Sequence, residues 1–301
     1  MTAALELADA RLAFGARPAL DGEGDAVGAG EMFGLVGPDG AGKTTTIRVL
    51  LGLLPLDAGT VRVLGLDPIA DGRAVKAQVG YLAQRFTLYG DLTVRENLEF
   101  FGGLHRVEGL AQRIDELLDF ARLAPFADRR GDQLSGGMQK KLALACTLVH
   151  TPRVLLLDEP TTGVDPVSRR EFWELLSRLR LGGMSVLLST PYLDEAERCT
   201  RVALVREGRV IALDTPAALR RSLGETLLEI VGSQLRTLRA ALLRSGRVES
   251  VHLFGDRVHV RTRDPDDELA DLLGATGIEV RSVRRIEPSL EDVFIRREEE
   301  A

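Results

Sequence analysis

A glycine-rich loop is the part of this sequence whose residue types and spacing point most directly to chemistry. It reads Gly37-Pro38-Asp39-Gly40-Ala41-Gly42-Lys43-Thr44. An apolar run, Met32 to Val36, precedes it, and a helix pattern, Thr45 to Leu54, follows it. A strand, a glycine loop and a helix in that order are the context that a phosphate-binding loop requires. The glycines let successive backbone N–H groups point at phosphate oxygens, beside the positive end of the helix dipole.

Two side chains at the end of this loop extend the prediction to the ligand. Lys43 can reach the β- and γ-phosphates as a point charge, and the Thr44 hydroxyl can take a position on Mg²⁺. The alternative is a glycine-rich loop that precedes a helix without binding anything. All the fixed positions of the motif are filled, which weakens that alternative. The loop therefore predicts a nucleoside triphosphate with Mg²⁺.

An acidic pair, Asp158 and Glu159, follows the continuous apolar run Val154 to Leu157. Such a run is typical of a strand covered on both faces, and parallel sheets bind ligands beyond the carboxyl ends of their strands. An aspartate there can hold Mg²⁺ through a water, and the glutamate beyond it can polarise an attacking water. Acidic pairs also occur in ordinary loops. The position after a phosphate-binding loop favours the functional interpretation.

A second glycine motif, Leu134-Ser135-Gly136-Gly137-Met138-Gln139, leads into the helix pattern Gln139 to Leu148. A serine hydroxyl and glycine N–H groups at a helix amino terminus form an anion site. A glycine helix cap without a ligand is the alternative. The combination of this run with the phosphate loop and the acidic pair resembles the signature of the ABC ATPases, and the resemblance covers residues 1–215.

The resemblance implies that the Ser135 motif closes over a nucleotide held by a second ABC ATPase domain, in a homodimer or a heterodimer. It implies that Gln84 senses the γ-phosphate and the membrane partner, and that Asp165, in the run Gly163 to Pro166, crosses the dimer interface. Phe14 corresponds to the aromatic residue that stacks on adenine; a core phenylalanine is the alternative. The expected binding residues for ATP are Phe14, Gly37, Pro38, Asp39, Gly40, Ala41, Gly42, Lys43, Thr44, Thr45, Ser135, Gly136, Gly137 and Asp165. The expected catalytic residues are Glu159, Gln84 and Lys43, and the expected Mg²⁺ residues are Thr44, Asp158 and Gln84.

Two positions depart from the family pattern. Pro191 stands where the family has a histidine that contacts the γ-phosphate, and proline offers neither a side-chain donor nor an N–H. Loss of one transition-state donor costs about 10²–10³ in rate. Asp39 stands where the family prefers asparagine. We therefore hypothesise an asymmetric system, in which this chain's own site binds ATP but turns over slowly while the motif from Ser135 to Met138 serves a competent site on a partner subunit. Thr190 is a candidate to cover part of the loss.

The remaining patterns predict an α/β P-loop NTPase core with an antiparallel β portion and a helical subdomain over 93–123. Predicted strands are Leu5 to Phe14, Val61 to Leu64, Val79 to Leu82, Ser185 to Ser189, Val202 to Val205 and Val210 to Leu213. A further strand can pass through Asp25 to Val27, but the strand propensity of these residues is poor. Predicted helices are Thr93 to His105, Leu110 to Leu123, Phe172 to Leu181 and Leu193 to Cys199. Thr93 and Glu96 form a capping-box pattern.

A domain boundary is predicted near Asp214-Thr215-Pro216, giving a nucleotide-binding domain over 1–215 and an accessory domain over 216–301. The second part has the order β-α-β-β-α-β, a small α+β ferredoxin-like arrangement, with its second helix at Asp266 to Leu273. It resembles the extension on nucleotide-binding subunits of bacterial two-component ABC exporters, which include drug and polysaccharide export systems. That resemblance does not identify a substrate.

The amino-acid composition of the chain limits the kinds of partner that we expect it to bind. The net charge is −6 and there is no basic stripe, which argues against nucleic acid. No apolar run approaches the ~20 residues of a membrane span, so another chain must supply the spanning helices if this protein works at a membrane. The resemblance to ABC exporters implies that a separate permease does so and holds this chain on the cytoplasmic face of the membrane. Candidates for docking the permease are Phe86, Tyr89, Phe100 and Phe101, of which the last two are equally suited to packing the helical subdomain. The resemblance implies an ATP-binding subunit that couples ATP binding and hydrolysis at a dimer interface to export through this permease. The alternatives are a non-hydrolysing regulatory or assembly subunit and a soluble ABC ATPase that is not tied to transport.

Overall fold

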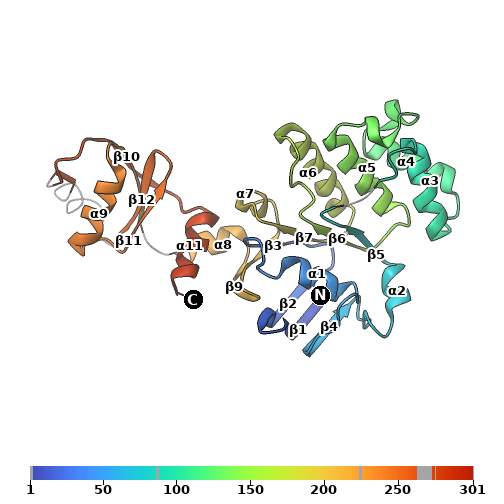
Figure 1. Ribbon diagram of the computed structural model, residues 1–301, viewed down its shortest axis with the longest axis horizontal. Coiled ribbons are helices and arrows are strands. Elements are labelled where there is room, and N and C mark those ends of the chain that lie inside the picture. Colours follow the sequence, from blue (N-terminus) through green and yellow to red (C-terminus); the bar gives the residue numbers. More distant parts are fainter. Residues whose placement is uncertain (1–2, 86–87, 224–225, 263–272, 275, 301) are drawn as a thin grey trace. The chain divides into compact units, whose positions relative to one another are not determined.

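The computed structural model describes residues 3–85, 88–223, 226–262, 273–274 and 276–300 (Figure 1). Contacts divide the chain into two compact units, Met1–Pro216 and Ala217–Ala301, each with its own sheets. In the described residues, no helix combines the length and the apolar character that a membrane crossing would need.

A six-stranded sheet forms the centre of the first unit. Its strand order is β5 (Val79–Leu82), β6 (Val154–Asp158), β7 (Ser185–Thr190), β3 (Met32–Val36), β8 (Arg201–Arg206) and β9 (Arg209–Asp214). The first five strands are parallel, and β9 is antiparallel to β8. Every residue of β3, β6 and β7 is buried, as expected for strands covered on both faces. The parallel arrangement brings the carboxyl ends of β3, β6 and β7 to one edge of the sheet.

A second, antiparallel sheet has the order β2-β1-β4, with β1 at Ala3–Phe14, β2 at Arg17–Gly28 and β4 at Ala58–Val63. The sequence predicted at most a weak strand at Asp25 to Val27, and this expectation was too short. β2 pairs with β1 along its whole length, from Ala3 opposite Gly28 to Phe14 opposite Arg17, with several bulges. Tertiary pairing along a long neighbour overrides the poor strand propensity of this glycine-rich and acidic segment.

Helices cover the central sheet (Figure 1), with α1 (Lys43–Leu50) on the side of the antiparallel sheet and α5 (Gly136–Leu148) and α6 (Pro166–Leu181) on the other. The helical subdomain adds α3 (Val94–His105) and α4 (Leu110–Phe120). The predicted capping box is confirmed, because Thr93 and Glu96 exchange side-chain to backbone hydrogen bonds. The short elements are α2 (Gly72–Lys76), α7 (Leu193–Ala196) and 3₁₀ turns at Ala124–Phe126 and Gly131–Gln133.

Helix α6 begins six residues before the predicted start at Phe172. Asp165 caps it by accepting hydrogen bonds from the N–H groups of Val167 (3.1 Å) and Ser168 (3.0 Å), and Pro166 takes the first helical position. The apolar pattern used for the prediction begins only where the helix reaches the core, so it missed the exposed first turns.

The second unit contains a four-stranded antiparallel sheet with the order β11-β12-β10-β13. Its elements are α8 (Pro216–Arg221), β10 (Thr226–Gly232), α9 (Leu235–Ser245), β11 (Ser250–Phe254), β12 (Arg257–Thr262), β13 (Val280–Ile286) and α11 (Leu290–Glu300). Leu238 and Leu242 of α9 pack on Ile230 and Val258 of the sheet. The strand order agrees with the predicted ferredoxin-like arrangement. The helix predicted at Asp266 to Leu273 lies outside the described residues except for Leu273.

Candidate functional site

The phosphate-binding loop connects β3 to α1 and depends on glycine at defined positions. Gly40 and Gly42 have positive φ angles of 80° and 108°. A Cβ atom on Gly42 would lie 2.4 Å from the carbonyl oxygen of Ala19, and one on Gly37 would lie 2.1 Å from that of Val205. The loop therefore has no room for side chains at Gly37 and Gly42, and its backbone is left to face a ligand.

Lys43 is the cation of this loop, and its side chain is only 4% exposed. The Nζ atom donates to the carbonyl oxygens of Gly37 (2.8 Å) and Pro38 (3.0 Å), and it lies 3.4 Å from Oε1 of Glu159. The ammonium group is thus held over its own loop and aimed at the acidic pair. Since β3 and β6 end at the same edge of the sheet, residues more than 100 positions apart meet here.

Asp158 ends β6 and receives hydroxyl donors from two directions. Thr44 Oγ1 donates to both carboxylate oxygens, at 3.0 and 2.9 Å, and Ser189 Oγ donates to Oδ1 at 2.6 Å. A hydroxyl beside a carboxylate is a pair of hard oxygen donors, which suits Mg²⁺. Among the described residues no group of three or more His, Cys, Asp or Glu side chains could hold a metal. The oxygens of Thr44 and Asp158 fit a Mg²⁺ that keeps waters and takes its other ligands from a bound triphosphate.

Glu159 follows Asp158 with an unusual backbone conformation, φ 45°, which costs energy for a residue with a side chain. Besides the ion pair with Lys43, its Oε2 accepts hydrogen bonds from Gln84 Nε2 (2.9 Å) and Thr162 Oγ1 (3.2 Å). Glu159 is therefore in direct contact with both of the other predicted catalytic residues, Lys43 and Gln84. Thr162 was missed, because its neighbours in sequence give no sign that it faces the acidic pair.

A cavity of about 530 Å³ opens over these residues, a size that suits a small organic ligand. Its lining comprises Phe14, Arg17, Pro18, Ala19, Asp39, Gly40, Ala41, Gly42, Lys43, Thr44, Thr45, Gln84 and Glu159. Phe14 is 54% exposed, so the alternative of a core phenylalanine is wrong. Asp39 brings a carboxylate to the cavity as expected from its position in the loop, and Arg17 brings a guanidinium that the sequence analysis did not identify.

The second glycine motif lies at a different cavity. Gly136 lines a space of about 460 Å³ together with Gly163 of the loop before α6. Ser135 caps α5 by accepting a hydrogen bond from the N–H of Met138 at 3.3 Å. A Cβ atom on Gly137 would lie 2.1 Å from Ser168 Oγ, so the motif is packed against the start of α6. Ser135, Gly136, Gly137 and Asp165 are thus grouped around α5 and α6 and do not line the cavity over Lys43.

The segment after β7 contains the expected departure at Pro191. The Thr190 hydroxyl donates to Glu195 Oε2 at 2.7 Å and accepts a hydrogen bond from the N–H of Tyr192 at 3.0 Å. Thr190 and Glu195 are each 1% exposed. Because the hydroxyl of Thr190 is buried and bonded in this way, it is not available to replace the missing imidazole.

Residues outside the predicted set connect the two motifs. Lys140 of α5 donates from Nζ to the backbone carbonyl of Gln84 at 3.1 Å. This bond links α5, the helix that Ser135 caps, to the glutamine whose side chain contacts Glu159. Ser189 bonds to both Asp158 and the N–H of Glu159. Ser189 was discoverable from the sequence, since a polar residue at the carboxyl end of an apolar parallel strand lies at the ligand-binding edge.

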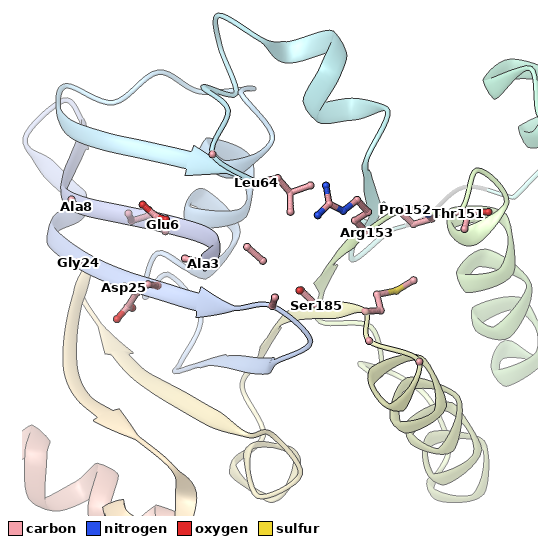
Figure 2. A pocket seen from close by; sticks show the side chains of 18 of the residues that line it. Ala3, Glu6, Ala8, Gly24, Asp25, Leu64, Thr151, Pro152, Arg153 and Ser185 are labelled. Atoms are coloured by element: carbon pink, nitrogen blue, oxygen red, sulfur yellow. The ribbon is translucent and has the colours of Figure 1, made fainter. Parts of the chain in front are cut away.

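A larger cavity, about 1150 Å³, lies at the opposite edge of the sheet, where β6 and β7 begin. Figure 2 shows Arg153 pointing into this space from the start of β6, and Glu6 and Asp25 on the strands of the antiparallel sheet. Burial raises the pKa of Asp25 to about 6, partly opposed by the charge of Arg201. The phosphate loop and the acidic pair do not line this cavity. The donor groups that converge on Asp158 and Glu159 lie at the cavity of about 530 Å³.

Comparison with known families gives two matches along the chain. The family "ABC transporter" matches residues 26–162, and the family "ATP-binding protein DrrA1-3-like, C-terminal domain" matches residues 215–297. The chain is 44% identical over 274 residues to the "Probable multidrug ABC transporter ATP-binding protein YbhF" of Escherichia coli (strain K12), covering 89% of this chain and 47% of that protein. The chain therefore spans about half the length of this relative.

Other relatives match along most of both chains. The "Nod factor export ATP-binding protein I" of Sinorhizobium fredii (strain NBRC 101917 / NGR234) is 41% identical over 298 residues, which is 97% of this chain and 85% of that protein. The "Daunorubicin resistance ATP-binding protein DrrA2" of Streptomyces coeruleorubidus is 39% identical over 293 residues, which is 94% of this chain and 91% of that protein. A solved "ATP binding subunit of ABC transporter" superposes with a TM-score of 0.66 and 30% identity, over 74% of this chain and 94% of that one.

Proposed function

We propose, from the premise that this chain belongs to the ABC transporter family of ATP-binding proteins, that it binds and hydrolyses ATP to power an exporter. The match over most of a 41% identical relative carries the premise. The observation that carries the proposal is the contact set at one cavity, in which Lys43 and Gln84 hold Glu159 while Thr44 holds Asp158. These groups match the tasks of phosphoryl transfer, which are anion binding, metal binding and activation of water.

Each group has a role set by its position. Phe14, exposed at the cavity, offers a face on which adenine stacks, and the loop from Gly37 to Thr44 offers N–H groups to the phosphates. Thr44 and Asp158 would hold Mg²⁺, which neutralises charge on the phosphates when bound. Glu159 acts as general base toward water, and Gln84 orients its carboxylate.

Nucleotide binding would change the partners of Lys43. Its ammonium group is bonded to two loop carbonyls and paired with Glu159. A triphosphate offers the same ammonium a stronger partner, and a switch of Lys43 to the phosphates would release Glu159 from its ion pair. The base would then become available only when a nucleotide is present.

A second ABC ATPase domain is the first proposed partner, as a copy of this chain or a related subunit. Ser135, Gly136 and Asp165 are exposed on the elements α5 and α6 and do not line the cavity over Lys43. Val167, next to this group, is 70% exposed, which suits a surface that becomes covered. A relative titled "Dimeric Structure of MJ0796, a Bacterial ABC Transporter Cassette" superposes with a TM-score of 0.62 at 25% identity.

A membrane permease is the second proposed partner, and binding to it would place the chain on the cytoplasmic face of the membrane. The rings of Tyr89 and Phe100 are 4.5 Å apart and both are about two-fifths exposed, with Phe101 5.5 Å from Phe100. Leu104 extends the patch and is 64% exposed. This apolar surface belongs to the helical subdomain and supports the docking role over the packing role for Phe100. Phe86, the fourth candidate, lies outside the described residues.

The domain assignment completes the proposal. Residues 1–215 act as the nucleotide-binding domain, and residues 216–301 act as an accessory domain of the type found in the DrrA-like match. The names of the relatives refer to multidrug transport, Nod factor export and daunorubicin resistance, which favours an export function without selecting a cargo. Nucleic acid is not a proposed partner, since the net charge of −6 disfavours it.

Pro191 leads us to retain the asymmetric version of this function. Thr190, the candidate to replace the histidine, has its hydroxyl bonded to Glu195. The test is the ATPase rate of the purified chain and of Pro191→His. We expect a slow parent and an increase of about 10²-fold in the variant. A fast parent that the histidine does not improve would rule out the asymmetry, and a chain that binds ATP without any hydrolysis in either form would favour a regulatory subunit.

A further inference from the structure

Ser189 of β7 is a buried hydroxyl that touches both acids of the site without lining the nucleotide cavity. Its side chain is 0% exposed. The Oγ atom donates to Asp158 Oδ1 at 2.6 Å and accepts a hydrogen bond from the N–H of Glu159 at 3.0 Å. One hydroxyl group therefore connects the carboxylate of the first acid to the backbone of the second.

The hydrogen bond from Ser189 to Asp158 leaves the donor without a competing task at the metal. Thr44 also bonds to Asp158, but its hydroxyl is a proposed ligand of Mg²⁺ and has that second task. Ser189 comes from the strand beside β6 and has no such task. A short O–H to carboxylate bond fixes the direction of a ligand oxygen, and partners of this kind typically contribute 10–100-fold to metal affinity or activity.

The bond to Glu159 acts on a strained backbone. Glu159 has φ 45°, and its N–H is held by both the hydroxyl (3.0 Å) and the carbonyl oxygen (3.1 Å) of Ser189. A positive φ at a residue with a side chain persists only when its surroundings hold it. Ser189 thereby controls the direction in which the Glu159 carboxylate leaves the strand.

We propose that Ser189 is a positioning residue for Mg²⁺ binding and for the general base, acting through Asp158 and Glu159. The inference rests on the proposed function, since it assigns to Ser189 a part in the same site. It adds a residue from β7, the strand that Pro191 follows, to groups that come from the phosphate loop and from β6.

The chain supplies a matched control on the same strand. Ser185 begins β7, is 4% exposed, and accepts a hydrogen bond from the N–H of Gly30 at 2.9 Å. Ser185→Ala removes a buried hydroxyl from the same strand at the edge of the sheet opposite to the acids. It therefore reproduces the packing change of Ser189→Ala without touching Asp158 or Glu159.

The experiment measures Mn²⁺ binding by electron paramagnetic resonance in the full chain with a non-hydrolysable ATP analogue, alongside ATPase kinetics. For Ser189→Ala we expect about tenfold weaker Mn²⁺ binding and a similar fall in kcat. Affinity for the analogue in EDTA should stay within about twofold, because the phosphate loop is intact. Ser189→Thr, which keeps the hydroxyl, should restore both properties, and Ser185→Ala should behave like the parent.

Several outcomes would overturn the proposal. Parent-like Mn²⁺ binding in Ser189→Ala contradicts it, and so does an equal loss in Ser185→Ala, which would indicate strand packing alone. If Ser189→Ala does not bind the analogue in EDTA, Ser189→Thr is compared with Ser189→Cys, and equal Mn²⁺ affinities of those two refute the role of the hydroxyl. A parent that binds no ATP is a different result, because it would refute the proposed function itself.

Discussion

The two edges of the central sheet each carry a cavity with acidic side chains, and they differ in what surrounds those acids. At the carboxyl edge, Glu159 faces Lys43 and Gln84, and Asp158 accepts bonds from two hydroxyls, over a cavity of about 530 Å³. At the amino edge, Asp25 lines a cavity of about 1150 Å³, and burial raises its pKa to about 6. Asp158 and Glu159 therefore have hydrogen-bond donors or a cation beside them, whereas the main influence on Asp25 is its burial.

This difference shows why cavity size alone does not locate the chemistry. A carboxylate becomes useful in catalysis or metal binding when donors fix its position and keep it charged. The segments that end at the carboxyl edge supply such donors, because the loops after β3, β6 and β7 converge there. The amino edge offers a larger space with fewer groups that converge on one point.

The largest expected effect tests the carboxyl edge at Glu159. In Glu159→Gln, we expect kcat for ATP hydrolysis to fall by about 10³-fold, because an amide cannot accept a proton from water. ATP affinity should be kept or improved, since Lys43 loses its ion pair at 3.4 Å and becomes free for phosphate. Steady-state ATPase assays and equilibrium ATP binding measure the two effects separately.

A variant at the other edge serves as the control for this experiment. Arg153 lines the larger cavity and is bonded to Gln78 Oε1 at 3.1 Å on the surface. Arg153→Ala should leave kcat within about twofold, as for ordinary surface substitutions. A comparable loss of activity in both variants would mean that the two edges are not functionally distinct.

The second effect in size concerns ATP affinity and Lys43. Lys43→Ala removes the cation at the loop and leaves the Glu159 carboxylate facing the incoming phosphates. We expect ATP affinity to fall about 10–100-fold, the range for loss of a charge-assisted hydrogen bond. Calorimetric titration measures this change, with the exposed Lys76 of α2 substituted in the same way as control. Unchanged ATP affinity in Lys43→Ala would contradict the proposal that this loop binds phosphate.

The carboxyl edge was largely predictable from the sequence, and the amino edge was not. The loop from Gly37 to Thr44 and the acids at 158 and 159 are contiguous motifs, so local spacing revealed them. The larger cavity is lined by residues from segments 3–9, 24–29, 64–65, 151–153 and 182–185, none of which has a motif of its own. Only the pairing of β1 with β2 and the order of the central sheet bring them together.

The same reason explains the other gaps. The length of β2 is set by its partner β1, which intrinsic propensity does not report. Ser189 meets Asp158 across neighbouring strands, so this contact depends on register and not on neighbouring residues. Thr162 lies only three residues after Glu159, and its contact depends on the conformation of the turn that follows β6. The start of α6 depends on the cap at Asp165, which a search for apolar periodicity overlooks.

The smallest expected effect concerns stability at the amino edge. The pKa of Asp25 is about 6 in the folded protein against an ordinary value of 3.8, so the folded state favours the neutral form. The resulting stability is present below pH 3.8 and is lost as the pH rises to about 6 and beyond. The difference of about two pKa units corresponds to at most ~3 kcal/mol, and partial solvent exposure reduces this to about 1–2 kcal/mol.

Asp25→Asn removes the ionisation and should therefore stabilise the protein by about 1–2 kcal/mol at pH 8 while changing little at pH 4. Thermal unfolding of parent and variant at both pH values measures this, with a Tm rise of about 2–8 °C expected at pH 8 alone. Asp9 is an exposed residue that lines the same cavity, so Asp9→Asn removes the same charge without removing a buried carboxylate and serves as the control. ATPase activity should be unchanged in both variants. If Asp25→Asn instead destabilised the protein at pH 8, the carboxylate would have favourable partners, and the two edges would hold their acids in the same way.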